Sequence, residues 1–322
     1  HYDEAVYQKG AENFKKLITD GIMFQEETDA LYIYKQIMGD HEQIGIVASA
    51  SVEEYLANTI KKHEFTRKDK EDDRTKHVLT LNANTGPVFL TYLAKEEIDS
   101  IVNNVVENNE PEYEFESDDL AKVKHIFWVV KDKETIEKLT AEFAKMNALY
   151  IADGHHRSAS AGRAYEIKKA ANPNHTGEEE YNYFLSIIFP HNQMYVMDYN
   201  RIVKDLNGNS KEEFLAKVAE KFEIENLGEV APYSPEALHN FGMYLDNEWY
   251  KLTAKEDAFD ANDPIESLDV AIMQNNLLSP ILGIGDPRTD KRIDFVGGIR
   301  GLKELERRIK DANWLIKPLF KS

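Results

Sequence analysis

Residues 148–171 constrain the fold of this chain more than any other stretch, because an apolar segment, a polar turn and a helical pattern follow one another there. The apolar run 148–152 predicts a buried strand, and Asp153-Gly154 is a turn signal. A helical pattern opened by small residues runs from Ser158 to about residue 171. A strand, a tight turn and a helix in this order predict an α/β arrangement whose helix start presents free backbone N–H groups.

The polar residues of this turn are suited to binding an anion. Free N–H groups and the positive end of a helix dipole attract negative charge, and small residues let a ligand come close. Arg157 offers a guanidinium fork that fits phosphate oxygens, and Asp153 is suited to holding a metal ion or orienting a hydroxyl. An ordinary surface turn with two exposed histidines fits the same pattern. The candidate ligand-binding residues are Gly154, His155, His156, Arg157 and Ser158.

Residues 61–77 form a dense charged segment. Between His63 and His77 it holds five acids and five lysines or arginines. A solvated helix would place Lys70 beside Arg74 and Asp69 beside Asp73, which are like-charge pairs, so a surface role explains the segment poorly. Phosphoryl transfer uses carboxylates to take a proton or hold a metal, and cations to cover phosphates. The segment is therefore a candidate for a functional site.

The rest of the chain predicts alternating helices and strands. The turn-forming residues 82–87 are expected to form a loop that binds a small polar ligand or serves only as a turn. The second half of residues 96–119 is expected to be an exposed connection. Helices are expected at residues 4–20, from Ser51 with a capping box to Glu54, and at 136–146, 211–222, 268–278 and 302–309. Strands are expected at residues 22–24, 30–38, 43–50, 78–81, 88–92, 125–130, 183–189, 194–197, 241–245 and 249–252.

The turn Asp153-Gly154-His155-His156-Arg157 resembles the Gly-x-x-Arg phosphate-binding turn of the ParB/sulfiredoxin superfamily. The chain as a whole is similar to the bacterial and archaeal family known as domain of unknown function 1015. That similarity rests on this turn and on His63-Glu64-Phe65-Thr66-Arg67, Lys70-Glu71-Asp72-Asp73-Arg74, Asn82-Ala83-Asn84-Thr85-Gly86-Pro87, Asp198-Tyr199-Asn200-Arg201 and Asp286-Pro287-Arg288.

The resemblance implies an α/β fold of mixed α+β type. It places a ParB/sulfiredoxin-like nucleotide-binding core at residues 121–205, between an α+β part at 1–120 and another at 206–322. It also implies that the natural chain continues before Tyr2 and after Trp314. Members of the superfamily include free-serine kinases, sulfiredoxins and CTP-dependent partition switches.

Composition excludes several kinds of function. The net charge of −19 over 322 residues repels a phosphate backbone, so no nucleic-acid partner is expected. The chain has no cysteine, which excludes a thiol nucleophile, a thiolate metal site and sulfiredoxin chemistry. No apolar run approaches the roughly 20 residues that cross a bilayer, so we expect a cytoplasmic protein without membrane contact.

The first functional hypothesis is a small-molecule kinase with ATP or ADP as donor and Mg²⁺ as its ion. The superfamily's serine kinases imply free L-serine as the acceptor and O-phosphoserine as the product. Glu64 is the expected general base, with Asp72 or Asp153 as the second choice, and Asp153 is the expected magnesium ligand. Arg67 and Arg201 are expected to add phosphate contacts, although Arg201 could instead brace Asp198 across a bend.

Two alternatives belong to other classes. The first is a ParB-like switch or binding module that binds and hydrolyses a nucleotide without phosphorylating an acceptor. The second is metal-dependent hydrolysis with His63, His155 and His156 as ligands. Adjacent histidines rarely reach one ion, and no His-x-x-x-His spacing is present, so the pattern favours this reading least.

Overall fold

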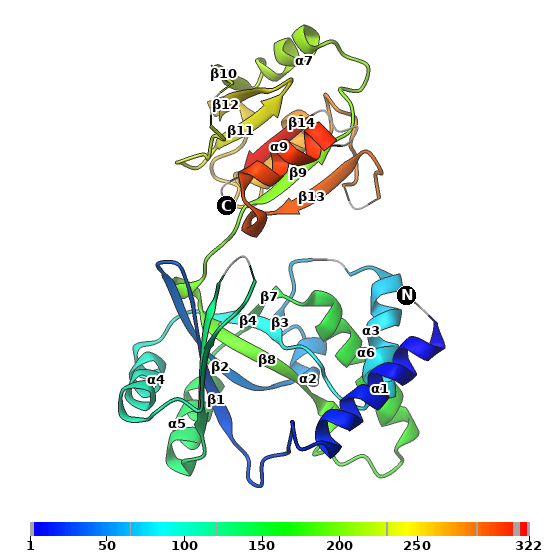
Figure 1. The fold of residues 1–322 in the computed structure, drawn as a ribbon, viewed down its shortest axis with the longest axis vertical. Coiled ribbons are helices and arrows are strands. Elements are labelled where there is room, and N and C mark those ends of the chain that lie inside the picture. The colour runs from blue at the N-terminus through cyan, green and yellow to red at the C-terminus, as the bar shows by residue number, and fades with distance from the viewer. Residues whose placement is uncertain are drawn as a thin grey trace. The chain divides into compact units, whose positions relative to one another are not determined.

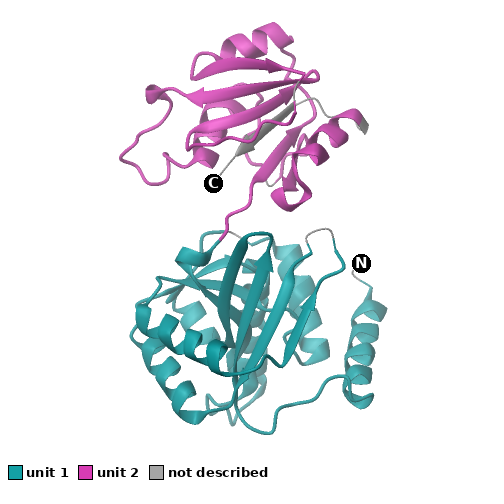
Figure 2. Cartoon of the chain, turned by 60° about the vertical axis from the view of Figure 1, so that its left-hand side comes forward, with its two compact units in different colours: residues 1–194 teal, residues 195–322 magenta. Residues whose placement is uncertain are grey.

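The computed structural model describes residues 3–64, 66–119, 122–229, 231–287 and 289–310 with their side chains, and residue 311 and residues 316–320 by their backbone. Phe65 and Arg288, which belong to two of the motifs above, lie outside the described residues. The chain divides into two compact units, residues 1–194 and residues 195–322 (Figure 2).

The first unit is built on a mixed sheet, in which the described residues form eight strands. Two neighbouring pairs are parallel, β3 with β7 and β4 with β8, and the other neighbours are antiparallel. In sheet order the strands are β3 (Ile60–Lys61), β7 (Leu149–Asp153), β4 (Val88–Tyr92), β8 (Tyr183–Pro190), β2 (His41–Ser51), β1 (Leu31–Met38), β6 (Lys124–Val130) and β5 (Tyr113–Glu116).

Helices flank this sheet in two groups (Figure 1). The first group is α1 (Glu4–Thr19), α2 (Val52–Leu56), α3 (Lys68–Leu81) and α6 (His155–Ala171), in which α3 packs on α6, α1 on α3, and α2 on α6. The second group is α4 (Glu96–Asn108) and α5 (Lys133–Ala144), which pack together. Sheet and helices form the mixed α/β fold that the sequence predicts in outline.

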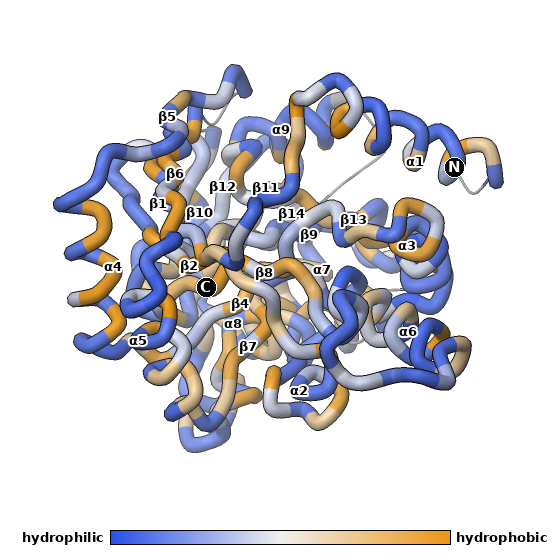
Figure 3. The backbone as a smooth tube through the Cα atoms, turned by 90° about the horizontal axis from the view of Figure 1, so that it is seen from below, coloured by the Kyte–Doolittle hydropathy of each residue, from blue (hydrophilic) through white to orange (hydrophobic). Residues whose placement is uncertain are grey.

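The core of the first unit follows the predicted apolar patterns. Ile126, Trp128 and Val130 alternate along β6 and are buried, as the period of a strand requires. In α4 the buried residues Ile98, Val102 and Val105 return at helical spacing, and the helix alternates between apolar and polar segments in Figure 3. The apolar residues that recur at strand and helix spacing pack together in one continuous core.

The second unit has a six-stranded sheet among its described residues. Its helices are α7 (Lys211–Val218), α8 (Asp269–Met273), continued by a π-helical turn at Gln274–Leu278, and α9 (Leu302–Asp311). Ser210 and Glu213 cap α7 reciprocally. In sheet order the strands are β10 (Phe222–Gly228), β12 (Glu248–Ala254), β11 (Asn240–Leu245), β14 (Ile316–Phe320), β9 (Tyr199–Val203) and β13 (Ile293–Gly297).

The two units differ from the three parts expected from the sequence, 1–120, 121–205 and 206–322. Strands β1, β2 and β4, which precede residue 120, share one sheet with β6, β7 and β8, which follow it. The first two expected parts therefore fold together. Strand β9 precedes residue 205 but pairs with β13, so it belongs to the second unit.

Several predicted elements change type. The expected strand 78–81 is the last turn of α3, which ends at Asn82 in the left-handed conformation (φ +53°). Residues 22–24 form a turn and leave Ile22 and Phe24 largely exposed, and residues 194–197 join no sheet. The acidic stretch 96–119 contains α4 and the edge strand β5. No helix of the described residues has the length and apolar character needed to cross a membrane.

Candidate functional site

The predicted strand–turn–helix junction is present, and the helix starts earlier than its apolar pattern suggests. Strand β7 ends at Asp153, Gly154 is the N-cap of α6, and His155 is already the first helical residue. Gly154 has φ +98°, a conformation that favours glycine. His155, His156 and Arg157 therefore form the first helical turn. The N–H of Arg157 donates to the Gly154 carbonyl at 2.9 Å, which leaves the N–H groups of His155 and His156 as those without a helical acceptor.

A cavity of about 540 Å³ lies at this junction. The three charged and polar segments that the sequence singled out around residues 64, 74 and 84 all meet the turn there. Glu64 and the turn therefore line one cavity, as the sequence analysis expected. The residues around the cavity are Glu64, Arg74, His77, Val78, Asn84, Thr85, Gly86, Asp153, Gly154, His155, His156, Arg157 and Ser160.

Glu64 and His155 are in direct contact. The Nδ1 atom of His155 lies 3.4 Å from Oε2 of Glu64, and the imidazole is only 4% exposed while the glutamate side chain is 59% exposed. Burial lowers the pKa of His155, and the nearby His63 lowers it further. A neutral imidazole can carry its proton on Nδ1, so the 3.4 Å contact places a potential donor beside the Glu64 carboxylate.

The other nitrogen of His155 is left without a partner. Nε2 is buried and accepts no hydrogen bond from any described residue. The ring of His63 packs edge-on against it, with ring centroids 4.4 Å apart. Among the described residues, no three His, Cys, Asp or Glu side chains are grouped closely enough to hold a metal ion, so His63, His155 and His156 do not form the expected ligand triad.

His156 and Arg157 are used as braces. The Nε2 atom of His156 accepts a hydrogen bond from the backbone N–H of Arg67 at 3.1 Å, which ties the charged segment to α6. The guanidinium of Arg157 donates to the Pro87 carbonyl and to the Asp153 carboxylate. These atoms were expected to contact phosphate, but in this structure they hold the loop before β4 and the end of β7 around the helix start.

Other predicted residues lie elsewhere. Asp72 is not part of the cavity, because it faces Arg163 of α6 at 2.6 Å. The Arg67 side chain forms a two-pronged ion pair with Asp69. The Ser158 hydroxyl is fully buried and donates to backbone carbonyls of its own helix. These side chains support the local structure instead of facing the cavity.

Arg201 belongs to the second unit and is not among the residues around the cavity. It lies on β9, where its guanidinium is over the rings of Tyr199 and Phe295 at 5.7 and 5.6 Å from their centroids. Burial lowers its pKa to about 10. The arginine therefore has a local aromatic setting, in addition to its hydrogen bond to the Tyr199 carbonyl.

Arg74 and His77 line the cavity, although the sequence analysis placed them in the charged segment without giving either residue a ligand role. They lie on α3, three residues apart, so both point to the same side of the helix. The short apolar run after His77 suggested a strand and hid this helical face. Asn84 and Thr85, which the sequence assigned either to ligand binding or to a turn, also line the cavity.

Comparison with known proteins identifies a family. No curated protein and no solved structure matches the chain. One family model matches residues 1–271, which include the whole first unit and the four segments around the cavity. The chain therefore belongs to the family described as protein of unknown function (DUF1015).

Proposed function

We propose that this protein is a nucleotide-dependent phosphotransferase that acts on a small hydroxyl metabolite. The observation that carries the proposal is the cavity at the start of α6, where an oriented carboxylate, Glu64, faces a helix N-terminus. A helix N-terminus binds phosphate, and a nearby carboxylate can take the proton of an attacking hydroxyl. Phosphoryl transfer requires mainly such positioning and charge neutralisation.

The local charge supports an anionic ligand. The whole chain carries −19, yet the cavity contains two arginines, Arg74 and Arg157, against two acids, Glu64 and Asp153, together with three histidines. Asp153 and Pro87 hold Arg157, whereas Arg74 has a longer contact of 3.4 Å with its neighbour Asp73, so Arg74 and His77 are the side chains we assign to phosphate. Asn84 and Thr85 supply hydrogen bonds for the polar acceptor.

Mg²⁺ fits this site. Asp153 lines the cavity, and Mg²⁺ is usually held by one or two carboxylates together with phosphates and water. When bound, the ion would neutralise charge on the phosphate groups. The residues of the chain then have distinct tasks: His155 orients Glu64, and Glu64 accepts the hydroxyl proton while the acceptor oxygen bonds to phosphorus and the nucleotide leaves.

The donor and acceptor come from the resemblance of the Asp153–Arg157 turn to the ParB/sulfiredoxin superfamily, which includes free-serine kinases. We propose ATP or ADP as the donor and free L-serine as the first acceptor to test, with O-phosphoserine as the product. A ParB-like switch that binds nucleotide without acceptor transfer is the competing function. The two differ in whether a phosphorylated acceptor forms.

The test is phosphoserine formation by purified protein with L-serine, Mg²⁺ and either ATP or ADP, measured by mass spectrometry. Glu64→Gln should lower the rate by about a hundredfold or more, as loss of a general base does. Asp72→Asn is the matched control, because Asp72 lies in the same charged segment but outside the cavity. Wild-type protein that forms no phosphoserine, or that loses equal activity in both variants, would overturn the proposal.

A further inference from the structure

A second cavity, of about 280 Å³, continues the first along α6. Both cavities are lined by Val78 and Asn84. Beyond these shared residues the second cavity follows Ala161, Ala164 and Lys168, which return every three or four residues on one face of the helix. From Arg157 to Lys168 this face extends about 17 Å at the helical rise per residue, so the two cavities lie next to each other along α6. We call the two cavities together the trough.

The second cavity has the chemistry of a site for a flat heterocycle. Its floor is formed by the small side chains of Ala161 and Ala164, so a ligand can lie close to the helix backbone. Tyr181 supplies an aromatic wall. Gln25 and Asn82 supply amide groups that both donate and accept hydrogen bonds, as the edge of a nucleobase requires.

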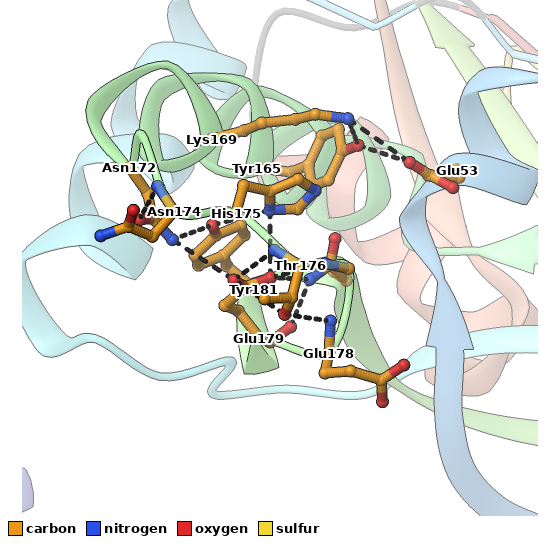
Figure 4. Close-up of polar contacts among 12 residues, drawn as sticks. Glu53, Tyr165, Lys169, Asn172, Asn174, His175, Thr176, Glu178, Glu179 and Tyr181 are labelled. Atoms are coloured by element: carbon orange, nitrogen blue, oxygen red, sulfur yellow. Dashed lines mark hydrogen bonds and ion pairs between the residues drawn. The ribbon is translucent and has the colours of Figure 1, made fainter.

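The Tyr181 ring is held firmly in place (Figure 4). Its hydroxyl accepts a hydrogen bond from the Asn172 amide at 3.0 Å and lies 2.9 Å from Nδ1 of His175. The His175 ring stacks on it with centroids 5.7 Å apart and planes 21° apart. Because its hydroxyl is hydrogen-bonded and His175 stacks on it, the Tyr181 ring would lose little conformational freedom when a ligand stacks against it.

The loop that carries these contacts is organised by Glu179. Its carboxylate accepts hydrogen bonds from the backbone N–H groups of Thr176 at 2.8 Å and Gly177 at 3.0 Å, and it pairs with His175 at 3.0 Å. One side chain thus fixes both the loop backbone and the histidine that supports Tyr181. None of these residues lines the first cavity.

We propose that the second cavity binds the nucleobase of a nucleotide whose phosphates lie at the start of α6, with Tyr181 as its stacking wall. This inference rests on the proposed function, because it assigns the donor of that reaction to the trough. Lys168 lies over the same ring, 6.0 Å from its centroid, and bonds to the Asn82 amide, so it closes the base end of the trough. The trough would then bind a nucleotide more tightly than pyrophosphate, because only the nucleotide has a base that contacts the second cavity.

The experiment compares binding of ADP and of inorganic pyrophosphate, each with Mg²⁺, by isothermal titration calorimetry. Tyr181→Ala should weaken ADP binding about tenfold or more, the usual cost of removing an aromatic stacking partner, and should leave pyrophosphate binding unchanged. Tyr181→Phe retains the ring and should bind ADP nearly as well as wild type. Pyrophosphate binding by the alanine variant also shows that the first cavity is still folded.

The outcomes separate this inference from the proposed function. Unchanged ADP affinity in Tyr181→Ala overturns the base site, as does an equal loss of ADP and pyrophosphate affinity in Tyr181→Phe. Selective loss of ADP affinity in Tyr181→Ala supports the base site even if the protein phosphorylates no serine. Serine phosphorylation with an unchanged KM for the nucleotide in Tyr181→Ala supports the function and overturns the base site.

Discussion

The Nδ1 atom of the buried His155 imidazole lies 3.4 Å from the exposed carboxylate of Glu64. This contact joins the charged segment before α3 to the first turn of α6. The other ring nitrogen, Nε2, is buried without a hydrogen-bond partner, so protonating the imidazole would bury a second N–H with no acceptor. The contact therefore makes the stability of the first unit depend on pH.

Stability should fall as pH drops below the ordinary pKa of histidine. Burial holds the folded-state pKa of His155 below its ordinary value of 6.5. Between that lowered value and 6.5 the unfolded chain binds a proton that the folded chain does not, so the free energy of unfolding decreases with falling pH. Urea denaturation across this range should show a shallower decrease for His155→Asn, which cannot titrate. Equal slopes in the two proteins would contradict the assignment.

Gly154→Ala should disturb the site by more than the strain of a left-handed backbone alone would cause. A Cβ at Gly154 would lie 3.0 Å from Nε of Arg157, in addition to the cost of about 1–2 kcal/mol for a left-handed residue. Gly177→Ala is the matched control, because φ there is +96° and no atom lies within 4 Å of the added Cβ. We expect both variants to lose stability in thermal unfolding, and only Gly154→Ala to lose pyrophosphate binding. Equal pyrophosphate binding in both would show that Arg157 adapts to the methyl group.

Arg157→Lys should destabilise the protein by about 1–3 kcal/mol, since a lysine cannot reach the Pro87 carbonyl and the Asp153 carboxylate with two separate nitrogens. Arg163→Lys is a suitable comparison on the same helix. Arg163 is about as exposed as Arg157 and pairs with Asp72, and such partly exposed ion pairs contribute roughly 0–1 kcal/mol, so the expected difference comes from the Pro87 carbonyl that Arg157 also holds. Urea denaturation measures both. A loss in Arg157→Lys no larger than in Arg163→Lys would show that the brace is dispensable.

Glu179→Gln should remove acid sensitivity from the loop that supports Tyr181. Backbone hydrogen bonds lower the pKa of Glu179 to about 2 from its ordinary 4.5. Its stabilising contribution is therefore complete above pH 4.5 and is lost as pH falls toward 2. Cleavage of residues 172–182 by an acid-stable protease should rise less steeply with acid in Glu179→Gln than in wild type. Glu178→Gln, an exposed neighbour, should retain the wild-type profile.

Local patterns predicted much of the fold around the site. The strand at 125–130, the β11–β12 hairpin and the strand–turn–helix at Gly154 appear where the apolar periods place them. Each depends on residues close in sequence. The strand predicted at residues 78–81 was wrong, because a short, mostly apolar run fits a strand or a helical turn equally well. That error hid the helical face carrying Arg74 and His77.

The roles of single side chains depended on contacts that no local pattern specifies. The proximity of Glu64 to the turn was predicted and is confirmed, whereas Asp72 pairs with Arg163, which the packing of α3 on α6 brings beside it. The boundary between the two units could not be predicted from local patterns either, because it follows from strands that pair across long sequence separations. The pairing of Arg157 with Pro87 needs β4 and β7 to be neighbours, which the sequence alone does not state.

The strand orders have a consequence for how the chain is made. In the first unit β8 is the last strand in sequence, yet it lies between β4 and β2 and joins the two halves of the sheet. In the second unit β14 is the last described strand and lies between β11 and β9. Neither sheet can be completed until its final strand has left the ribosome. We therefore expect each unit to fold late and in one cooperative step, and to leave strand edges exposed until then.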